Sequence, residues 1–497
     1  MSSPVTAIVL AAGQGTRMRS SRAKVLHEAA GWPLLRHVLA AVRALEPARI
    51  TVVVGHQADQ VRAAVADLPV EFVLQAEQRG TGHAVLQARA QVLAASGPVL
   101  ILYGDVPCVR PTTLSRLEDT FRRSGRPLAM ATARVADPAG YGRVVRDARG
   151  EVLRVVEHKD ASEAERALDE INTGLYMVDA RFLAAWLARV EQGGSRASSA
   201  LTGEVYLTDL VALAAQQGGV AALEVADAEE VLGVNTREEL ARAAARLRAD
   251  IARRHMAAGV TIVDPERTYI DAGVEIGPDT IVHPGAHLRG RTRIGAGATI
   301  DVGAVLTDMV VGDGTEILPY CVLEQSEVGA GARLGPHTRI RPGCHLADGV
   351  HVGNFVELKK TTIGPGSKAN HLTYLGDATI GAGVNIGAGT ITCNYDGARK
   401  HQTVIEDGAF IGSDSQLVAP VTVGKDAYVA SGSSITEDVP PGALAIARSR
   451  QVNKPGWVAA RGPKRGSAGH PTEKAGAVSG ATRETAARTP ADKRGSR

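Results

Sequence analysis

The chain has 497 residues, which is too long for a single hydrophobic core, so we expect two or more domains. Its composition of 44% hydrophobic and 22% charged residues is typical of a globular protein, and no apolar run is long enough to span a membrane. The four cysteines stand singly, without a C-x-x-C spacing, which argues against a zinc site or a disulfide framework, and the N-terminus lacks a secretion-type pattern, so we expect a cytoplasmic protein.

Buried strands alternate with amphipathic helices in the first half of the chain. The apolar patterns predict strands over residues 5–10, 50–54, 70–75 and 99–102, and helices over residues 33–45, 59–68 and 82–93. This alternation predicts an α/β fold, a doubly wound Rossmann-like domain over residues 1–235, which binds ligands at the carboxyl ends of its strands.

A glycine-rich turn follows the first predicted strand. Gly13 and Gly15 allow the backbone to approach a phosphate closely. The turn is neither a dinucleotide fingerprint, because Thr-Arg-Met follows where a third small residue is needed, nor a Walker A loop, because no Gly-Lys-Ser/Thr follows. Arg17 and Lys24 instead supply two cations on one side of the turn, placed to reach a triphosphate.

A carboxylate ends the strand predicted at residues 99–102. Asp105 follows Tyr103 and Gly104 and precedes a proline two positions later. Such a carboxylate suits Mg²⁺, which takes few protein ligands when phosphates supply the other oxygens. The plainer alternative is an aspartate that caps the next helix.

A capping box marks the joint between the two halves of the chain. Thr236, with Glu239 three positions later, predicts a helix start, and Leu240, Leu247 and Ile251 form one apolar stripe. We expect residues 236–256 to form a linker helix.

In the second half an aliphatic residue returns at every sixth position. Neither a helix, with its period of 3.6, nor a flat strand, with its period of two, keeps this pattern on one face. Short strands wound into a coil do, so residues 257–457 are predicted to form a parallel β-helix. The plainer function of such a coil is a spacer or a trimerisation stalk. The aliphatic positions, with a slip near Met309, are Ile276, Val282, Leu288, Ile294, Ile300 and Leu306, then Leu334, Ile340, Leu346, Val352 and Leu358, then Ile411, Leu417, Val423, Val429 and Ile435.

Polar residues that the stacking does not need interrupt this period around His371. We expect a projecting loop at residues 370–374 that presents the histidine. A single histidine is more often structural, but an imidazole is also the natural general base for acyl transfer to an amine. Glu357 is predicted to orient its ring, and Arg341, Lys359 and Lys400 are candidates to hold a sugar phosphate.

The C-terminal segment is basic. Residues 458–497 hold nine Lys or Arg against three Asp or Glu, so the tail carries +6 and the rest of the chain 3 − 6 = −3. The tail is rich in small residues and lacks aromatics, so we expect a disordered, solubilising extension. Nucleic-acid or membrane binding is the weaker alternative.

The motifs of the first half resemble those of sugar-phosphate nucleotidyltransferases, and specifically the uridyltransferase half of the bifunctional N-acetylglucosamine-1-phosphate uridyltransferase / glucosamine-1-phosphate acetyltransferase family. They are Leu10-Ala11-Ala12-Gly13-x-Gly15-Thr16-Arg17-Met18 with Lys24, Gln75, Gly80-Thr81-Gly82-His83-Ala84, Tyr103-Gly104-Asp105, Gly140-Tyr141-Gly142-Arg143, Glu157-His158-Lys159-Asp160 and Asn172-Thr173-Gly174. Val205 departs from the first tyrosine of the family's Gly-Glu-Tyr-Tyr-Leu-Thr-Asp.

The resemblance implies a role for each of these positions. It implies that Mg²⁺ would bind Asp105 and Asn235, and the cations Lys24 and Arg17, which would offset charge on the phosphates, are predicted to be catalytic. Sugar contacts would fall on Gly140, Glu157 and Asn172. The site for UTP and the UDP-sugar would be completed by Leu10, Ala11, Ala12, Gly13, Gln75, Gly80, Thr81, Tyr103 and Gly104.

The motifs of the second half, Ser367 to Asp377, Asn385-Ile386-Gly387-Ala388-Gly389 and Cys393-Asn394-Tyr395-Asp396-Gly397, are similar to those of the acetyltransferase half of the same family. That resemblance implies a left-handed β-helix, a homotrimer with acetyl-CoA sites shared between subunits, and His371 as the base. The amino-sugar phosphate would contact Arg341, Lys359, Tyr374, Asn385 and Lys400. Acetyl-CoA would contact Ala388, Asn394, Tyr395, Ser413, Ser431 and Arg448, where Ser431 replaces a common alanine.

The leading hypothesis is therefore a two-site enzyme that acetylates glucosamine 1-phosphate and then transfers uridylyl from UTP, giving UDP-N-acetylglucosamine. Its partners are small molecules and copies of itself, with no nucleic acid expected. Two alternatives stay open. One is a nucleotidyltransferase whose coil only assembles the trimer, and the other is a regulatory or scaffold protein that binds nucleotide sugars without catalysis.

Overall fold

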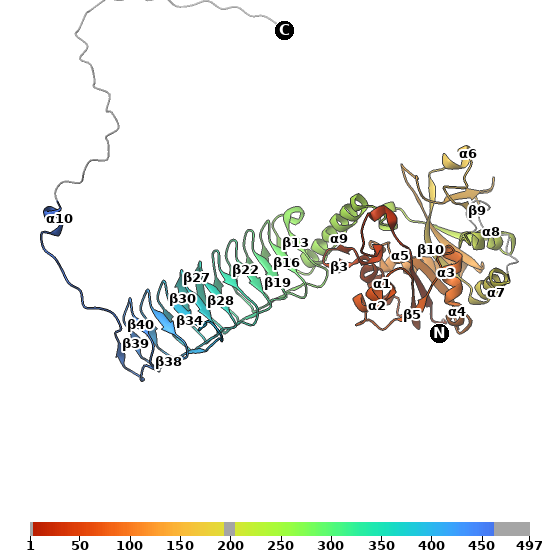
Figure 1. Cartoon of the computed structure of the whole chain (residues 1–497). Helices are drawn as coiled ribbons and strands as arrows, with labels where there is room; N and C mark the ends of the chain where they lie inside the picture. Colours follow the sequence, from red (N-terminus) through yellow and green to blue (C-terminus); the bar gives the residue numbers. More distant parts are fainter. Residues whose placement is uncertain (1–2, 193–203, 462–497) are drawn as a thin grey trace, which may run out of the picture. The chain divides into compact units, whose positions relative to one another are not determined.

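The computed structural model describes residues 3–192 and 204–461, and its first part is built on one mixed sheet (Figure 1). The strand order is β11-β7-β10-β6-β1-β4-β5, with the β8–β9 hairpin attached to β10. The strands are β1 (Thr6–Ala11), β4 (Arg49–Val54), β5 (Glu71–Leu74), β6 (Val99–Tyr103), β7 (Leu128–Arg134), β8 (Arg143–Arg146), β9 (Val152–Val156), β10 (Glu170–Val178) and β11 (Val220–Glu224).

Helices cover both faces of this sheet, as the doubly wound prediction requires. In β1 the side chains of Ala7 and Val9 join a core with α1, α2 and α5, whereas those of Ile8 and Leu10 join a second core with α3, α4, α7 and α8. These helices, with the short α6, are α1 (Leu34–Arg43), α2 (Ala58–Ala64), α3 (Thr81–Gln87), α4 (Arg89–Leu93), α5 (Pro111–Ser124), α6 (Glu163–Arg166), α7 (Ala180–Glu191) and α8 (Asp209–Gln216).

Four details differ from the predicted elements. The helix predicted at residues 82–93 breaks at Ala88, and the one predicted at residues 59–68 ends at Ala64. A hairpin of β2 (Glu28–Ala29) and β3 (Trp32–Pro33) precedes α1. The sheet is also not wholly parallel, because β10 runs antiparallel to both β6 and β7.

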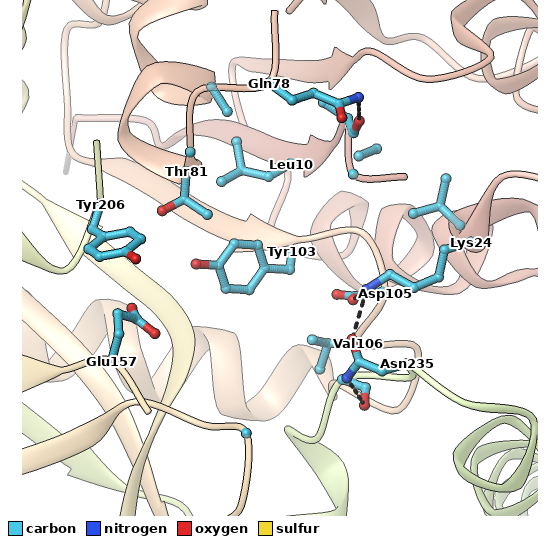
Figure 2. A pocket seen from close by; sticks show the side chains of 18 of the residues that line it. Leu10, Lys24, Gln78, Thr81, Tyr103, Asp105, Val106, Glu157, Tyr206 and Asn235 are labelled. Atoms are coloured by element: carbon cyan, nitrogen blue, oxygen red, sulfur yellow. Dashed lines mark hydrogen bonds and ion pairs between the residues drawn. The ribbon is translucent and has the colours of Figure 1, made fainter. Parts of the chain in front are cut away.

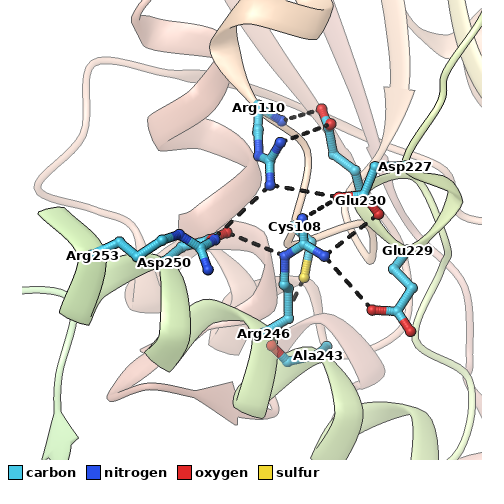
Figure 3. Close-up of polar contacts among 9 residues, drawn as sticks. All are labelled: Cys108, Arg110, Asp227, Glu229, Glu230, Ala243, Arg246, Asp250 and Arg253. Atoms are coloured by element: carbon cyan, nitrogen blue, oxygen red, sulfur yellow. Dashed lines mark hydrogen bonds and ion pairs between the residues drawn. The ribbon is translucent and has the colours of Figure 1, made fainter. Parts of the chain in front are cut away.

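The predicted linker helix is α9 (Arg237–Ala257), and its capping box is present in full. Towards its start, Leu240 and Leu247 pack against Ala29 and Leu34, while Ile251 further along is buried in the core of the coil. An ionic network on the helix also contacts the segment before α5 and the short helix η3 (Ala228–Glu230) (Figure 3). It joins Arg110, Asp227, Glu229, Glu230, Arg246, Asp250 and Arg253.

The second part is a β-helix made of three parallel sheets, and each strand pairs with strands one coil before and after it. Sheet one contains β12 (Thr261–Ile262), β15 (Ile281–Val282), β18 (Thr299–Ile300), β21 (Glu316–Ile317), β24 (Arg333–Leu334), β27 (His351–Asn354), β30 (Lys368–His371), β33 (Asn385–Ile386), β36 (Phe410–Ile411), β39 (Tyr428–Val429) and β41 (Leu444–Ala445).

Sheet two contains β13 (Tyr269–Ile270), β16 (His287–Arg289), β19 (Val305–Thr307), β22 (Val322–Glu324), β25 (Arg339–Ile340), β28 (Glu357–Lys359), β31 (Tyr374–Gly376), β34 (Ile391–Cys393), β37 (Gln416–Val418) and β40 (Ser434–Ile435). Sheet three contains β14 (Glu275–Ile276), β17 (Arg293–Ile294), β20 (Val310–Val311), β23 (Glu327–Val328), β26 (His345–Leu346), β29 (Thr362–Ile363), β32 (Ala378–Ile380), β35 (Thr403–Ile405) and β38 (Val421–Val423).

The six-residue period is confirmed as the inward-facing side chains of this coil. Val282, Ile300 and Leu334 are fully buried, and each lies over its counterpart in the next coil. The register explains the slip near Met309. Val282 pairs with Ile300, but Ile300 pairs with Ile317, which is one position closer along the chain. The slip is therefore one residue removed from a corner, not a break in the coil.

The coil's last strand is β41, and a second compact unit begins at Arg448. It includes the short helix α10 (Trp457–Ala460), and the greater part of the predicted tail, residues 462–497, lies outside the described residues. No helix among the described residues has the length and apolar character needed to cross a membrane.

Candidate active sites

A cavity of about 480 Å³ opens at the carboxyl ends of β1 and β6 (Figure 2). The structure brings nearly all of the predicted nucleotide-site residues to its wall: Leu10, Ala11, Ala12, Gly13, Arg17, Lys24, Gln75, Gly80, Thr81, Tyr103, Asp105, Gly140, Glu157, Asn172 and Asn235. Gly104 is the exception. Its amide donates to the carbonyl of Leu10 at 2.8 Å, and a β-carbon there would lie 3.1 Å from Leu35. Gly104 therefore packs behind the wall.

Four polar side chains converge at one end of this cavity (Figure 2). Lys24 Nζ donates to Asp105 Oδ2 and, at 3.1 Å, to Asn235 Oδ1. Arg17 donates to the same amide oxygen at 2.9 Å. Lys24 and Asp105 are mostly buried, with 15% of each side chain exposed. Two cations and two oxygen ligands thus face one point, which suits the binding of phosphate groups.

The capping box of α9 fixes Asn235 at this point. The Glu239 carboxylate accepts from the backbone amides of both Asn235, at 2.6 Å, and Thr236, at 2.8 Å. The described residues contain no group of three His, Cys, Asp or Glu side chains that could hold a metal. Asp105 and Asn235 together fit Mg²⁺, which takes one or two protein oxygens when phosphates complete its shell.

The other end of the cavity is lined by polar side chains that are partly or fully buried and hydrogen-bonded to neighbouring residues. Burial raises the pKa of Glu157, whose carboxylate accepts from Thr208 at 3.1 Å. Burial, and then the charges of Glu157 and Asp105, raise the pKa of Tyr103 far above its usual range. The side-chain oxygen of Asn172 accepts from Tyr176 at 2.9 Å. Such a surface suits hydroxyl groups rather than a second anion.

Several cavity residues were not predicted as site residues. Gln78 donates to the carbonyl of Ala12 at 2.8 Å, and Tyr141, Lys159, Glu204 and Tyr206 also line the wall. All of them except Gln78 lie inside motifs that carry the family resemblance. Their position beside predicted site residues could therefore have indicated that they line the cavity.

Val205, which stands where the family has a tyrosine, holds the neighbouring cavity segment through hydrogen bonds of its backbone and not of its side chain. The amide of Val205 donates to the carbonyl of Arg79 at 2.9 Å, and its carbonyl accepts from Gly82 at 2.8 Å. Residue 203, at the start of the same motif, lies outside the described residues.

His371 lies at the end of β30 with an exposed side chain. The expected projecting loop is absent there: Leu372 makes a tight corner at φ 45°, and β31 begins at Tyr374. The inserted loop comes later. Thr362 pairs with Thr379 at the ordinary spacing of one coil, but Thr379 pairs with Val404, a clearly longer step along the chain. The extra residues lie between β34 and β35 and carry Lys400.

The predicted orienting contact between Glu357 and His371 is wrong. Glu357 lies on β28, in the second sheet, and its carboxylate pairs with Arg341 at 3.2 Å. The ring of His371 instead contacts Asn354, with 2.9 Å between Nδ1 and Oδ1. Asn354 and Glu357 both belong to the preceding coil, but Asn354 is the register partner of His371, whereas Glu357 is the register partner of Tyr374.

Three predicted acetyl-CoA residues continue the line of His371 along one corner of the coil. Lys368 pairs with Asn385, Asn385 with Phe410, and Phe410 with Tyr428. At the third position after each of these paired residues come, in order, His371, Ala388, Ser413 and Ser431. With about 4.8 Å between strands, the histidine heads a strip of small side chains long enough for an extended ligand.

The remaining predicted acetyl-CoA residues lie elsewhere. Asn394 is buried, and its amide donates to Asp377 at 2.5 Å, whereas Tyr395 is exposed and donates to the carbonyl of Gly397 at 2.6 Å. Both belong to the inserted loop. Arg448 is the first residue of the second compact unit, so its place beside the strip stays a prediction.

Three predicted phosphate-binding cations lie close together, with the carboxylates of Asp377 and Glu357 among them. Lys359 pairs with Asp377 at 3.1 Å, and the amide of Arg341 donates to the carbonyl of Leu358, so Arg341 is the neighbour of Lys359 in the preceding coil. The adjoining Lys359 lowers the pKa of Lys400, which places their side chains together. Tyr374 and Asn385 are half-buried on the following coils. The excess of positive charge suits a phosphate monoester.

Comparison with known proteins supports both halves of this picture. Residues 7–174 match the MobA-like NTP transferase domain, residues 266–374 the GMPPB C-terminal domain, and residues 402–437 the bacterial transferase hexapeptide (six repeats). The first match covers the strands that form the cavity, and the last covers coils that carry the strip of small residues.

Curated relatives match along almost the whole chain. The protein called "Bifunctional protein GlmU" from Anaeromyxobacter sp. (strain Fw109-5) is 54% identical over 462 residues, 92% of this chain and 93% of its own. Proteins of the same name from Trichlorobacter lovleyi and Sorangium cellulosum are each 50% identical, over 91% of this chain and 97% and 96% of theirs.

Proposed function

This chain belongs to the family of bifunctional GlmU proteins, and we propose that it carries two active sites that act in sequence. In the β-helix, acetyl-CoA acetylates glucosamine 1-phosphate. In the α/β domain, UTP then uridylylates the resulting N-acetylglucosamine 1-phosphate and pyrophosphate leaves. The product is UDP-N-acetylglucosamine.

The α/β site needs no general base, because a sugar 1-phosphate is already an anionic nucleophile at neutral pH. Lys24 and Arg17 neutralise charge on the α-phosphate and on the departing pyrophosphate. Asp105 and Asn235 would hold Mg²⁺, which adds further neutralisation of phosphate charge when bound. Glu157 and Asn172, the hydrogen-bonding side chains at the other end of the cavity, support a role for that end in binding the sugar hydroxyls.

The β-helix site requires a base, because the attacking amine must first lose a proton. His371 takes that proton, the amine nitrogen forms a bond to the thioester carbonyl carbon, and the carbon–sulfur bond breaks to release the CoA thiolate. Arg341, Lys359 and Lys400, with Tyr374 and Asn385, would hold the sugar phosphate. Ala388, Ser413 and Ser431 would bind the extended arm of acetyl-CoA, together with Asn394, Tyr395 and Arg448.

We also infer a homotrimer in the cytoplasm, with Mg²⁺ as the metal. Exposed apolar side chains beside the proposed base support association: Phe355 and Leu372 follow Asn354 and His371 directly and are 55% and 64% exposed. Such side chains in adjoining coils suit contact with another copy of the chain.

The observation that carries the proposal is the position of His371, at the head of the strip of small residues. A coupled assay of both reactions tests it. Changing His371 to alanine should abolish acetyl transfer and spare uridylyl transfer, whereas His345→Ala, which alters another exposed histidine of the coil, should spare both. A coil that only assembles the trimer predicts no acetyl transfer by the unchanged chain, and a scaffold predicts UTP binding without pyrophosphate release.

A further inference from the structure

The proposed base touches one polar side chain of the coil before it. Asn354 ends β27 and His371 ends β30, and the two are register partners in neighbouring strands (Figure 1). Nδ1 of the histidine lies 2.9 Å from Oδ1 of the asparagine. Among the described residues, no other side chain bonds to the ring. We propose that Asn354 is a positioning residue for acetyl transfer, which fixes the tautomer and direction of the His371 imidazole.

The chemistry of the amide gives this contact its effect. A side-chain amide oxygen can only accept a hydrogen bond, so the proton of the neutral ring must reside on Nδ1. Nε2 then keeps its lone pair, which is the form that can take a proton from an amine. An amide also brings no charge, so it orients the ring without favouring the imidazolium, as a carboxylate would.

The backbone holds the two residues against each other. Leu372, directly after His371, donates its amide to the carbonyl of Asn354 at 3.1 Å. Gly353 permits this closeness, because a β-carbon there would lie 1.9 Å from the carbonyl oxygen of Asn370. Phe355 and Leu372 both have positive φ, of 58° and 45°, so the chain turns the same corner after each partner. The contact is therefore set by the coil and not by a mobile loop.

The charged groups around the ring do not replace this contact. His351 on β27 interacts electrostatically with His371, and Lys368 lies on β30 itself, so both nearby ionisable groups of this sheet are basic. On β28, Glu357 is engaged with Arg341. On the following coil the corner residue is Ala388, which carries no charge. Asn354 therefore supplies the hydrogen-bond acceptor for Nδ1 of His371.

This inference rests on the proposed acetyl transfer, and two substitutions in the full chain test it. Asn354→Ala leaves Nδ1 without its acceptor, so kcat for acetyl transfer should fall about 10- to 100-fold, with KM within about 2-fold. Asn354→Asp restores an acceptor but adds a charge. It should recover most of kcat at high pH, while the pH of half-maximal rate moves up by about one unit.

The control is Glu327→Ala, which removes the acceptor of another exposed histidine ring, His345, on the third sheet. It should leave both profiles unchanged, and uridylyl transfer should be equal in all variants, which excludes general misfolding. A rate for Asn354→Ala within 2-fold of the unchanged chain, or an unshifted pH profile for Asn354→Asp, would overturn this inference alone. No acetyl transfer by the unchanged chain would overturn the proposed function as well.

Discussion

Lys24 and Asn235 are 211 positions apart in the chain, yet Nζ of the lysine lies 3.1 Å from the side-chain oxygen of the asparagine. The lysine comes from the segment after the glycine-rich turn, and the asparagine from the segment before α9. Asp105, at the end of β6, accepts from the same ammonium group. Three distant segments therefore have to fold correctly before this cluster of charged and polar groups exists.

Replacing Lys24 with alanine should lower the rate of uridylyl transfer by about 10²- to 10³-fold, because a preorganised positive charge on the transferring group is lost. Acetyl transfer should be unchanged. The measurement is pyrophosphate release with UTP and N-acetylglucosamine 1-phosphate. Arg22→Ala is the matched control, since Arg22 is exposed and pairs with Glu28 outside the cavity. Equal losses in the two variants would argue against a specific role for Lys24.

Asp209→Asn should stabilise the α/β domain at high pH. Burial, and then the charges of Glu157 and Asp160, raise the pKa of Asp209 to about 6, against about 3.8 when the chain is unfolded. Between these values the folded state binds more protons than the unfolded state, so the stability that this carboxyl contributes is present at low pH and is lost as the pH rises through 6.

The Asp209→Asn variant has no carboxyl at this position, so it does not lose stability as the pH rises. Its unfolding temperature should exceed that of the unchanged chain by about 2 to 4 °C at pH 8, corresponding to about 1 kcal/mol, and by clearly less at pH 5. Calorimetry at the two pH values measures this. Asp119→Asn, at an exposed position of α5, should show no such pH dependence. A constant difference between the two pH values would contradict the assigned ionisation.

Glu230→Ala should destabilise the α/β domain by about 2 to 4 kcal/mol. The Glu230 side chain is only 4% exposed and accepts from the backbone amide of Arg110 at 3.0 Å, so its removal leaves a partly buried donor unpaired (Figure 3). Glu229→Ala provides the matched control. That side chain is 70% exposed and 3.7 Å from Arg246, so its loss should stay within about 0.5 kcal/mol. Denaturant unfolding compares the two, and similar effects would show that burial is not the cause.

Lys400→Ala should raise KM for glucosamine 1-phosphate about 10-fold with kcat within about 2-fold, because a charge that binds the phosphate equally in ground and transition states is lost. Lys359 lowers the pKa of Lys400, so in the unchanged chain Lys400 should lose its charge at a lower pH than an ordinary lysine, and KM for glucosamine 1-phosphate should then increase. The variant should lack that alkaline increase in KM. Arg399→Ala removes the same charge one position earlier in the loop, and an equal effect there would indicate general attraction instead.

The sequence period was sufficient to predict which side chains fill the β-helix. Val282 and Leu334 face inward because each side of a three-sided coil takes about six residues and points one aliphatic side chain into the core. The strand-end rule was likewise sufficient to predict that Asp105 lies at the cavity formed by the carboxyl ends of β1 and β6.

The lateral contacts could not be predicted in the same way. Glu357 was expected to orient the ring of His371, but the register places Asn354 beside that ring. Asn354 lies 17 positions before His371, which is the ordinary spacing of one coil, so the partner follows from the register of the strands and not from polarity. The sequence also could not predict the direction of β10, because a strand buried on both faces has the same apolar composition whether it runs parallel or antiparallel to its neighbours.

Helix α9 belongs to two cores at once. Leu240 and Leu247 pack with residues of the α/β domain, while Ile251 and Ala252 are buried with the first coils of the β-helix. Unfolding of either core would expose part of the apolar surface of α9 and remove the contacts that this core makes with the helix. Thermal unfolding should consequently spread from one domain to the other through α9. The temperatures at which the two activities are lost should therefore be linked, although the two proposed sites share no residue.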